Sequence, residues 1–370
     1  MSPTYAEINL KNFVYNYLNL RKKAKDAMVM PVVKADAYGH GMVECVEALA
    51  KLTKDKPEYY GVALLEEAIE LRNAKIINEP ILCFAPICKE DIPKYLKLKI
   101  YPTVTCDEHI KILRSYSGKQ KLKFHINIDT GMRRLGFDYR TAAEKIKIIS
   151  RIPNVIIDGI YTHFATSDEF EKHYAKIQLL RFNSVIKKLE EAGINYGCVH
   201  ASNSGAIIDL PEAKFDMVRP GISLYGYYPS LETTESVKLK PVMSIISKVS
   251  TTRKLLKGES ISYGRKYYAS NDTTIATVPI GYADGFVRAL TNNSYAIIKN
   301  KIYEQVGSVT MDRIMINVNN DKVKIGDEVV LIGKRKNLEV NAWDWAVVLN
   351  TIPYEVTCNI SKRVPRKYIK

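Results

Sequence analysis

The chain has 370 residues, 46% of them hydrophobic, and a formal net charge of +15. This length accommodates two domains, one of them a barrel, and no run of about 18 apolar residues predicts a membrane span. The six cysteines are scattered without a C-x-x-C pair, which argues against a metal site of the zinc type and is typical of a reducing compartment. Because no basic region followed by an apolar one opens the chain, we expect no secretory signal and a cytoplasmic protein.

The positive charge is spread along the chain rather than gathered in one arm. The one compact basic run, Lys362–Lys367, is short, and no recognised nucleic-acid-binding module accompanies it. We therefore expect no nucleic acid and no membrane as partners. A lysine-rich proteome or a mild attraction for anionic metabolites explains the charge.

The first 230 residues repeat one theme: a short apolar run, a turn and an amphipathic helical stretch. A short extended start and a helical stretch come first, within Thr4–Lys25. Helices are predicted, among others, over Met42–Lys51, Leu65–Asn73, Tyr139–Ser150 and Tyr174–Ala192. Strands are predicted over Met28–Val33, Tyr59–Ala63, Ile81–Phe84, Ile100–Val104, Leu122–Ile128, Val155–Thr162, Tyr196–His200 and Phe215–Val218. Alternating strands and helices imply a parallel sheet, and eight strands predict an α/β fold with a (β/α)8 TIM-like barrel over residues 1–230.

Beyond residue 230 the helical spacing largely disappears, and Thr, Val, Ile and Tyr dominate between Gly-containing turns. Strands are predicted over Val242–Thr252, Thr274–Val278, Tyr295–Ile302, Ile314–Val318, Glu328–Ile332 and Glu355–Ile360, and a helix only over Ala342–Leu349. The pattern predicts a mostly β carboxyl-terminal domain over residues 231–370, reached through a linker near 228–238. The first few residues could pack with this second domain.

In a TIM barrel, functional groups lie at the carboxyl ends of the strands. The first predicted strand ends at Lys34 within Pro31–Gly41. A lysine against apolar surroundings loses its proton more readily and can form a Schiff base, although a snorkelling lysine would give the same pattern. Later strands end at His163, Ser204 and Arg219. A core histidine, a helix cap and a surface ion pair would explain these one at a time, but their recurrence at successive strand ends favours a shared site.

The stretch Pro31–Gly41 (PVVKADAYGHG) closely resembles the pyridoxal-phosphate lysine motif of the alanine racemase family. The resemblance extends from Thr4 to about Arg366, and it implies pyridoxal 5'-phosphate (PLP) as the cofactor and no metal. It implies that Lys34 carries the cofactor. The other cofactor-binding residues that it implies are Tyr38, Ser204, Gly221 and Ile222 at the phosphate, His163 beside the ring, Arg219 at the pyridine nitrogen, and Asn203 and Lys362.

An arginine at the ring nitrogen has a physical meaning. A guanidinium group cannot accept a proton, so it keeps that nitrogen unprotonated, whereas an aspartate would protonate it. A less electron-demanding ring stabilises carbanion charge less fully, and a proton removed from Cα therefore tends to return. This suits racemisation and disfavours transamination or decarboxylation.

Racemisation also needs a proton donor and acceptor on each face of the substrate. Lys34 would serve one face, and the resemblance assigns the other to Tyr263 of the partner subunit in a head-to-tail homodimer; spacing alone favours a surface aromatic residue. A tyrosine ordinarily loses its proton only near pH 10, so the resemblance also implies a helping chain from Tyr263 through His163 to Arg219. The residues implied at the substrate are Tyr282, Arg134 and the backbone N–H of Met311.

Two positions depart from the family pattern. Asn127 stands where many members have a carbamylated lysine that orients the carboxylate-binding arginine, so Arg134 must be positioned otherwise, for example by an anion such as chloride. Lys362 stands where members commonly have a tyrosine at the narrow site entrance. We hypothesise that side chains larger than methyl enter, serine first. The alternative is that a neighbouring side chain refills the gap, since a pocket discriminates by only about 1–3 kcal/mol per methylene-sized group.

The expected protein is an isomerase, an alanine racemase that supplies D-alanine for peptidoglycan in the cell wall. A serine or broad-specificity amino-acid racemase on the same scaffold is the main alternative. A non-catalytic PLP-binding barrel is disfavoured because such proteins lack the β domain with Tyr263. A PLP-dependent decarboxylase of related fold is disfavoured because its glycine-rich phosphate motif is missing from the sequence.

Overall fold

The computed structural model describes residues 3–370, which form two compact units. The first, called here the barrel unit, comprises Val14–Ala37 and Met42–Leu239. The second, called the β unit, comprises residues 3–13, Tyr38–Gly41 and Lys240–Lys370. The amino-terminal residues thus belong to the same unit as the carboxyl-terminal third of the chain.

The barrel unit is built on a parallel sheet. Over residues 3–370 its strand order is β2 (Met28–Val29), β10 (Met217–Val218), β9 (Cys198–His200), β8 (Val155–Tyr161), β6 (Leu122–Asp129), β5 (Ile100–Val104), β4 (Ile81–Pro86) and β3 (Tyr60–Val62), with β7 (Phe137–Asp138) beside β6. A parallel bridge between Val32 and Gly61 joins the two ends of this order. The Val33 N–H donates to the Gly61 carbonyl at 2.9 Å. The sheet therefore closes, and the predicted TIM-like barrel is confirmed.

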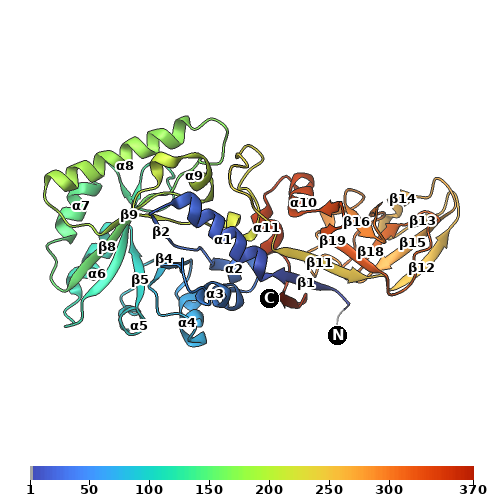
Figure 1. The fold of residues 1–370 in the computed structure, drawn as a ribbon, viewed down its shortest axis with the longest axis horizontal. Helices are drawn as coiled ribbons and strands as arrows, with labels where there is room; N and C mark the ends of the chain where they lie inside the picture. Colours follow the sequence, from blue (N-terminus) through green and yellow to red (C-terminus); the bar gives the residue numbers. More distant parts are fainter. Residues whose placement is uncertain (1–2) are drawn as a thin grey trace. The chain divides into compact units, whose positions relative to one another are not determined.

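Helices surround the barrel strands. They are α1 (Leu10–Ala24, which begins in the β unit), α3 (Met42–Ala50), α4 (Leu65–Ala74), α5 (Ile92–Leu98), α6 (Asp107–Ser115), α7 (Ala142–Ile149), α8 (His173–Glu191) and α9 (Ser204–Asp209), with 3-10 turns η1 (Pro211–Ala213) and η2 (Ile222–Tyr225). Figure 1 shows α4 to α8 on the outside of the strands. The longest, α8, buries Ala175, Gln178, Leu179, Phe182, Val185 and Leu189, the spacing of a one-sided amphipathic helix. Over residues 3–370, no helix combines the length and apolar character that a membrane crossing needs.

In its described residues, 3–13, 38–41 and 240–370, the β unit contains three sheets. The largest has the order β17 (Lys301–Glu304), β16 (Tyr295–Ile298), β19 (Glu328–Arg335), β11 (Met243–Lys248), β1 (Tyr5–Asn9) and β21 (Arg366–Ile369), with β20 (Leu338–Val340) on β19. The others are β12 (Thr251–Leu255), β15 (Thr273–Val278) and β18 (Ile314–Asn317), and the pair β13 (Ser260–Ile261) and β14 (Tyr267–Tyr268). Its helical segments are α10 (Ala342–Leu349), α11 (Pro353–Cys358), η3 (Tyr263–Arg265) and η4 (Arg288–Leu290). This confirms a mostly β second part.

Three of the predicted strands in the β unit differ from the structure. Glu355–Ile360 lies largely in α11, which starts at Pro353. The fixed φ of proline suits the first helical turn, where its missing N–H costs nothing. Tyr295–Ile302 is a hairpin, because Lys299 and Asn300 turn the chain with φ of 50° and 62°. Such a pair of left-handed residues is typical of a tight hairpin turn.

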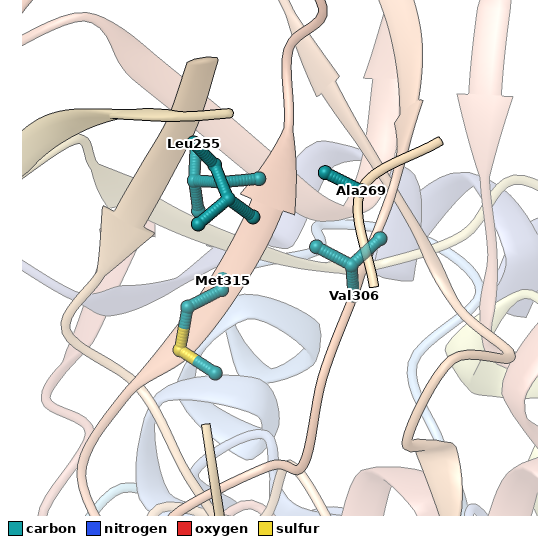
Figure 2. Packing of buried hydrophobic residues seen from close by; sticks show 5 residues of the cluster. Leu255, Ala269, Val306 and Met315 are labelled. Atoms are coloured by element: carbon teal, nitrogen blue, oxygen red, sulfur yellow. The ribbon is translucent and has the colours of Figure 1, made fainter. Parts of the chain in front are cut away.

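The predicted strand Val242–Thr252 is also divided, into β11 and β12 of two different sheets. The three-stranded sheet that contains β12 supports a small apolar core (Figure 2) made by Leu255, Ala269, Ile275, Val306 and Met315. Ile261 and Tyr267, from the pair β13 and β14, pack against this core. The core thereby anchors the segment that leads into Tyr263.

Candidate active site

Lys34 is half-buried and opens an unusual turn, α2 (Lys34–Gly39). The four residues from Ala35 to Tyr38 have φ between 52° and 54°, so the turn is left-handed. This handedness places Cβ close to the following carbonyl oxygen and costs about 1–2 kcal/mol per residue. The backbone N–H of Ala35 donates to Glu67 Oε1 at 2.6 Å, which is one of the contacts that hold the turn. The motif predicted a turn after the strand but not its handedness.

The far end of this turn belongs to the β unit. Tyr38 is buried, and its ring lies 5.8 Å from that of Tyr354 on α11. A Cβ on Gly39 would lie 2.3 Å from the carbonyl oxygen of Thr357, so only glycine fits there. The guanidinium of Arg366 donates to the Gly39 carbonyl at 3.1 Å. Sequence reasoning missed Tyr354 and Arg366 as residues that fix the turn.

Arg219 follows β10, and several polar groups of the barrel unit hold its side chain. Its side chain donates to His200 Nδ1 at 2.8 Å and to the carbonyls of Thr162 and Ala201 at 2.8 and 3.0 Å, and His163 Nδ1 lies 3.3 Å away. Arg219 is 3% exposed, and burial lowers its pKa to about 10. The guanidinium is therefore still a cation at neutral pH. The structure brings the predicted pair Arg219 and His163 together.

The loops after β9 and β10 also meet. The Ser204 hydroxyl accepts from the backbone N–H groups of Gly221 and Ser223 at 2.9 and 3.3 Å. Asn203 caps α9, its side-chain oxygen accepting from the Ala206 N–H at 3.1 Å. Within residues 3–370 the buried Ser223 hydroxyl has no hydrogen-bond partner. The predicted residues Asn203, Ser204, Gly221 and Ile222, which opens η2, thus form one cluster of hydroxyl and backbone N–H groups suited to a phosphate.

The electrostatic field at this end of the barrel is positive. Burial, together with the charges of Arg219, Arg134 and Lys34, lowers the pKa of His163 well below its usual value. His163 is therefore neutral, and each of the charges that act on it is a cation. A field of this sign, beside hydroxyl and N–H donors, fits a cofactor with a phosphate and a substrate with a carboxylate.

The two arginines in the loop after β6 differ in their ion pairs and hydrogen bonds. Asn127 is 9% exposed on β6, and Arg133 pairs with Asp138 at 2.8 Å. The exposed Arg134 has no hydrogen bond or ion pair within the described part of the chain, residues 3–370. The structure thus shows how Arg133 is held, and the role of Arg134 stays a prediction.

Three of the predicted residues in the β unit are exposed side by side along one groove. Tyr263 is 74%, Met311 51% and Tyr282 43% exposed, and all three line one groove of about 1650 Å³. The backbone that carries them is fixed. Ser308 Oγ donates to the Tyr263 carbonyl at 2.6 Å, and the Tyr282 N–H donates to the Thr310 carbonyl at 3.0 Å. Their side chains are therefore presented on an ordered frame.

Lys362 is exposed in the same unit. The neighbouring Arg363 pairs with Asp312 at 2.7 Å and with Asp284 at 3.3 Å. Within residues 3–370 no hydrogen bond or ion pair connects Lys362 to another side chain. Its assignment to the cofactor therefore rests on the resemblance alone.

Comparison with known proteins assigns the family. Residues 8–229 match the family described as alanine racemase, N-terminal domain, and residues 242–368 match alanine racemase, C-terminal domain. An alanine racemase of Carboxydothermus hydrogenoformans is 40% identical over 376 positions that cover all of both chains.

Two solved structures are similar along the whole chain. An alanine racemase of Clostridium difficile 630 has a TM-score of 0.90 and 40% identity, and covers 100% of this chain and 96% of its own. An alanine racemase of Bacillus anthracis with bound L-Ala-P has a TM-score of 0.91 and 34% identity, with the same coverage. The resemblance drawn from the motif around Lys34 is thereby confirmed: the chain belongs to the alanine racemase family, a family of isomerases.

Proposed function

We propose that this protein interconverts L- and D-alanine with PLP as its cofactor. It would act in the cytoplasm and supply D-alanine for peptidoglycan. In this proposal, residues 1–230 bind the cofactor and residues 231–370 complete the site of a partner subunit in a homodimer. The observation that carries the proposal is the set of groups at the strand ends: the charges of Arg219, Arg134 and Lys34 act on the buried His163, and Ser204 binds Gly221 in the loops after β9 and β10.

The residues present suit PLP. Lys34 would carry it, and Ser204, Gly221 and Ile222, with Tyr38, would bind its phosphate through hydroxyl and N–H groups. A relative with bound L-Ala-P supports a site for an alanine-like ligand. When bound, PLP acts as an electron sink that stabilises negative charge at the Cα of the substrate.

Arg219 limits what chemistry follows. Its guanidinium is buried and can only donate hydrogen bonds, so it would offer the ring nitrogen of bound PLP an N–H without transferring a proton. An unprotonated ring nitrogen would favour return of the proton to Cα over competing reactions. His163, neutral and beside Arg219, would keep the ring in position.

The two faces of Cα need two proton-transfer groups. Lys34 Nζ would exchange the proton on one face, and the hydroxyl of Tyr263 of the partner subunit would exchange it on the other. The exposure of Tyr263, Tyr282 and Met311 in one groove supports this arrangement, since an ordered but uncovered aromatic surface suits contact with a second chain. Arg134 and the N–H of Met311 would bind the substrate carboxylate.

The test is a chiral product assay of the purified, PLP-loaded protein on L-alanine and L-serine, together with the variant Tyr263→Phe. We expect rapid formation of D-alanine, and a loss of about 10²–10⁴-fold in kcat for Tyr263→Phe with PLP still bound. The exposed Tyr268, on the neighbouring β14, provides the matched control Tyr268→Phe, which should keep full activity. Bound PLP without any racemisation would contradict the proposal and indicate a PLP-binding protein.

A serine or broad-specificity racemase is the second candidate. It is favoured by the exposed Lys362 and by Asn127, the two positions at which the sequence departs from the family pattern. Formation of D-serine at a rate comparable to that of D-alanine would support it. Fast D-alanine with little D-serine would show that both substitutions are tolerated in an alanine racemase.

A further inference from the structure

A line of polar side chains runs from Arg219 through the interior of the barrel. Arg219 Nη1 lies 2.8 Å from His200 Nδ1, and His200 Nε2 lies 2.9 Å from His125 Nδ1. The other ring nitrogen of His125, Nε2, has no hydrogen-bond partner within residues 3–370, and Asp158 Oδ2 faces it at 3.6 Å, beyond hydrogen-bond distance. Both histidine side chains are 0% exposed. We call these four residues the Arg219–Asp158 chain.

The Arg219–Asp158 chain allows only one assignment of protons to its two histidine rings. Arg219 can only donate, so His200 Nδ1 must accept. Burial, and the charge of Arg219, lower the pKa of His200 well below its usual value, and burial also lowers that of His125, so both rings are neutral. Neutral His200 then carries its proton on Nε2 and donates to His125. His125 in turn carries its proton on Nε2, directed at Asp158.

The local backbone is shaped to place Asp158 in this line. The pairing of β6 with β8 shifts register between Phe124 and His125, leaving Asp158 unpaired as a bulge residue. A bulge re-aims the side chain that it carries. The next residue, Gly159, leaves room for the ring, because a Cβ there would lie 2.6 Å from His125 Nδ1. The sequence thus provides both the carboxylate and the space for the imidazole.

Asp158 is held as a carboxylate by other contacts as well. The Tyr59 hydroxyl donates to it at 2.6 Å, and Lys123 Nζ lies 3.0 Å away. Burial acts against the charged form, but these two contacts and His125 hold the pKa of Asp158 well below its usual range. A fixed negative charge on β8 therefore lies at the Asp158 end of the Arg219–Asp158 chain.

A metal ion is a weaker explanation of the same cluster. His125, His200 and Cys198 have ligand atoms within 4.8 Å of one another. A metal would need the lone pairs of His200 Nε2 and His125 Nδ1, which moves the His200 proton to Nδ1, 2.8 Å from a guanidinium that also donates. Two donors would then face each other, and a second cation would lie near Arg219.

We propose that Asp158 is a positioning residue for Arg219: through His125 and His200 it fixes the direction of the hydrogen bonds that hold the guanidinium. Within residues 3–370 no carboxylate pairs directly with Arg219, so its charge stays available to the site while a distant carboxylate sets its geometry. The inference rests on the proposed function, in which Arg219 faces the cofactor ring nitrogen.

The test is the variant Asp158→Asn, which keeps the shape of the side chain and removes its charge. We would label the histidine rings with ¹⁵N in the PLP-loaded protein, which has only six histidines, and read the tautomers of His125 and His200 by NMR. The expected result is a change from one fixed tautomer to a mixture in both rings and a loss of kcat on the order of 10-fold. A proton on His200 Nδ1 would break the hydrogen bond from Arg219 and so release the guanidinium from its position. Asp107→Asn is the matched control, since it removes the same charge from a carboxylate that pairs with Lys145 on the outer helices, and it should preserve tautomers and kcat.

Unchanged tautomers and unchanged kcat in Asp158→Asn would overturn the inference. If that variant does not fold, His125→Phe interrupts the same chain with Asp158 intact, and His200 should then lose its fixed tautomer; an unaltered His200 signal would again contradict us. The tautomer signals do not depend on turnover. A wild-type protein that fails to racemise would therefore contradict the proposed function. Normal racemisation in the wild type, with tautomers that do not respond to Asp158→Asn, would contradict this inference alone.

Discussion

The strand ends of the barrel unit and the groove of the β unit present their functional side chains in opposite ways. Arg219 is 3% exposed and has four polar partners within its own unit, whereas Tyr263 is 74% exposed on a backbone that is nonetheless hydrogen-bonded in place. Groups that hold a cofactor are pre-organised by the chain that carries them. Groups that we propose to act on a second chain need an ordered frame and an uncovered surface. The contrast predicts that the two regions fail in different ways when altered.

The largest effect should come from Lys34→Ala. Removal of the group proposed both to carry the cofactor and to exchange one proton should lower kcat at least about 10⁴-fold and weaken PLP retention. The measurement is D-alanine formation together with the absorbance of bound PLP. Lys145→Ala is the control, because that lysine pairs with Asp107 on the outer helices. Substantial activity in Lys34→Ala would remove the barrel strand end from the mechanism.

A smaller effect is expected from Gly281→Ala in the β unit. A Cβ there would lie 2.2 Å from the Thr310 carbonyl and 2.4 Å from that of Met311, so the segments that carry Tyr282 and Met311 must shift. A displacement of about 1 Å in positioning groups can cost about 10²-fold, and we expect that loss in kcat/KM with PLP retained. Gly326→Ala, where a Cβ meets no neighbouring atom but φ is 89°, is the control for backbone strain without a steric clash in the same unit. Normal kcat/KM in Gly281→Ala would separate this segment from the site.

The barrel histidines should give a pH-dependent stability. Burial lowers the pKa of His163, His200 and His125 in the folded state, so between those values and about pH 6.5 the unfolded chain binds protons that the folded chain does not. The free energy of unfolding should therefore fall as pH drops below 6.5, by up to about 1.4 kcal/mol per pH unit for each histidine. Urea unfolding between pH 7.5 and 5 measures this slope. His163→Asn should reduce it, and an unchanged slope would contradict a neutral buried His163.

The smallest effect concerns substrate choice. If Lys362 widens the site, Lys362→Tyr should lower the ratio of kcat/KM for serine over alanine by up to about 10-fold, the scale of one methylene-sized group. Lys362→Met removes the charge without adding a rigid ring. It therefore separates the effect of losing the charge from the effect of narrowing the site. An unchanged ratio in the tyrosine variant would show that Lys362 does not set specificity.

The barrel could be predicted because its signal is local. Each strand is a short apolar run beside an amphipathic helix, and the groups at the strand ends follow from that pattern. The left-handed α2 could not be predicted, since Ala35 and Asp36 have no preference for φ near 52° and are held there by distant groups such as Glu67. Likewise α11 depends on Pro353, and a run of β-forming residues outweighed it in the sequence.

The site was only partly accessible from the residues themselves. His163, Ser204 and Arg219 follow strand ends, so topology brings them together. Tyr263 is one exposed aromatic residue among several, and only the family resemblance distinguished it. The connection from Asp158 to Arg219 joins β8, β6, β9 and the loop after β10, and no sequence spacing predicts which side chains of those segments meet inside a barrel.

The central claim is that each site combines the barrel of one chain with the groove of another, and mixing two inactive variants tests it most directly. Lys34→Ala and Tyr263→Phe chains would be prepared separately, then unfolded, mixed and refolded together with PLP. If sites are shared, the mixed dimer contains one site with both native residues, and random pairing should restore about a quarter of the wild-type rate of D-alanine formation. If Lys34 and Tyr263 of the same chain act together, no pairing contains an intact site, and the mixture would remain as inactive as its parts, which would contradict the account.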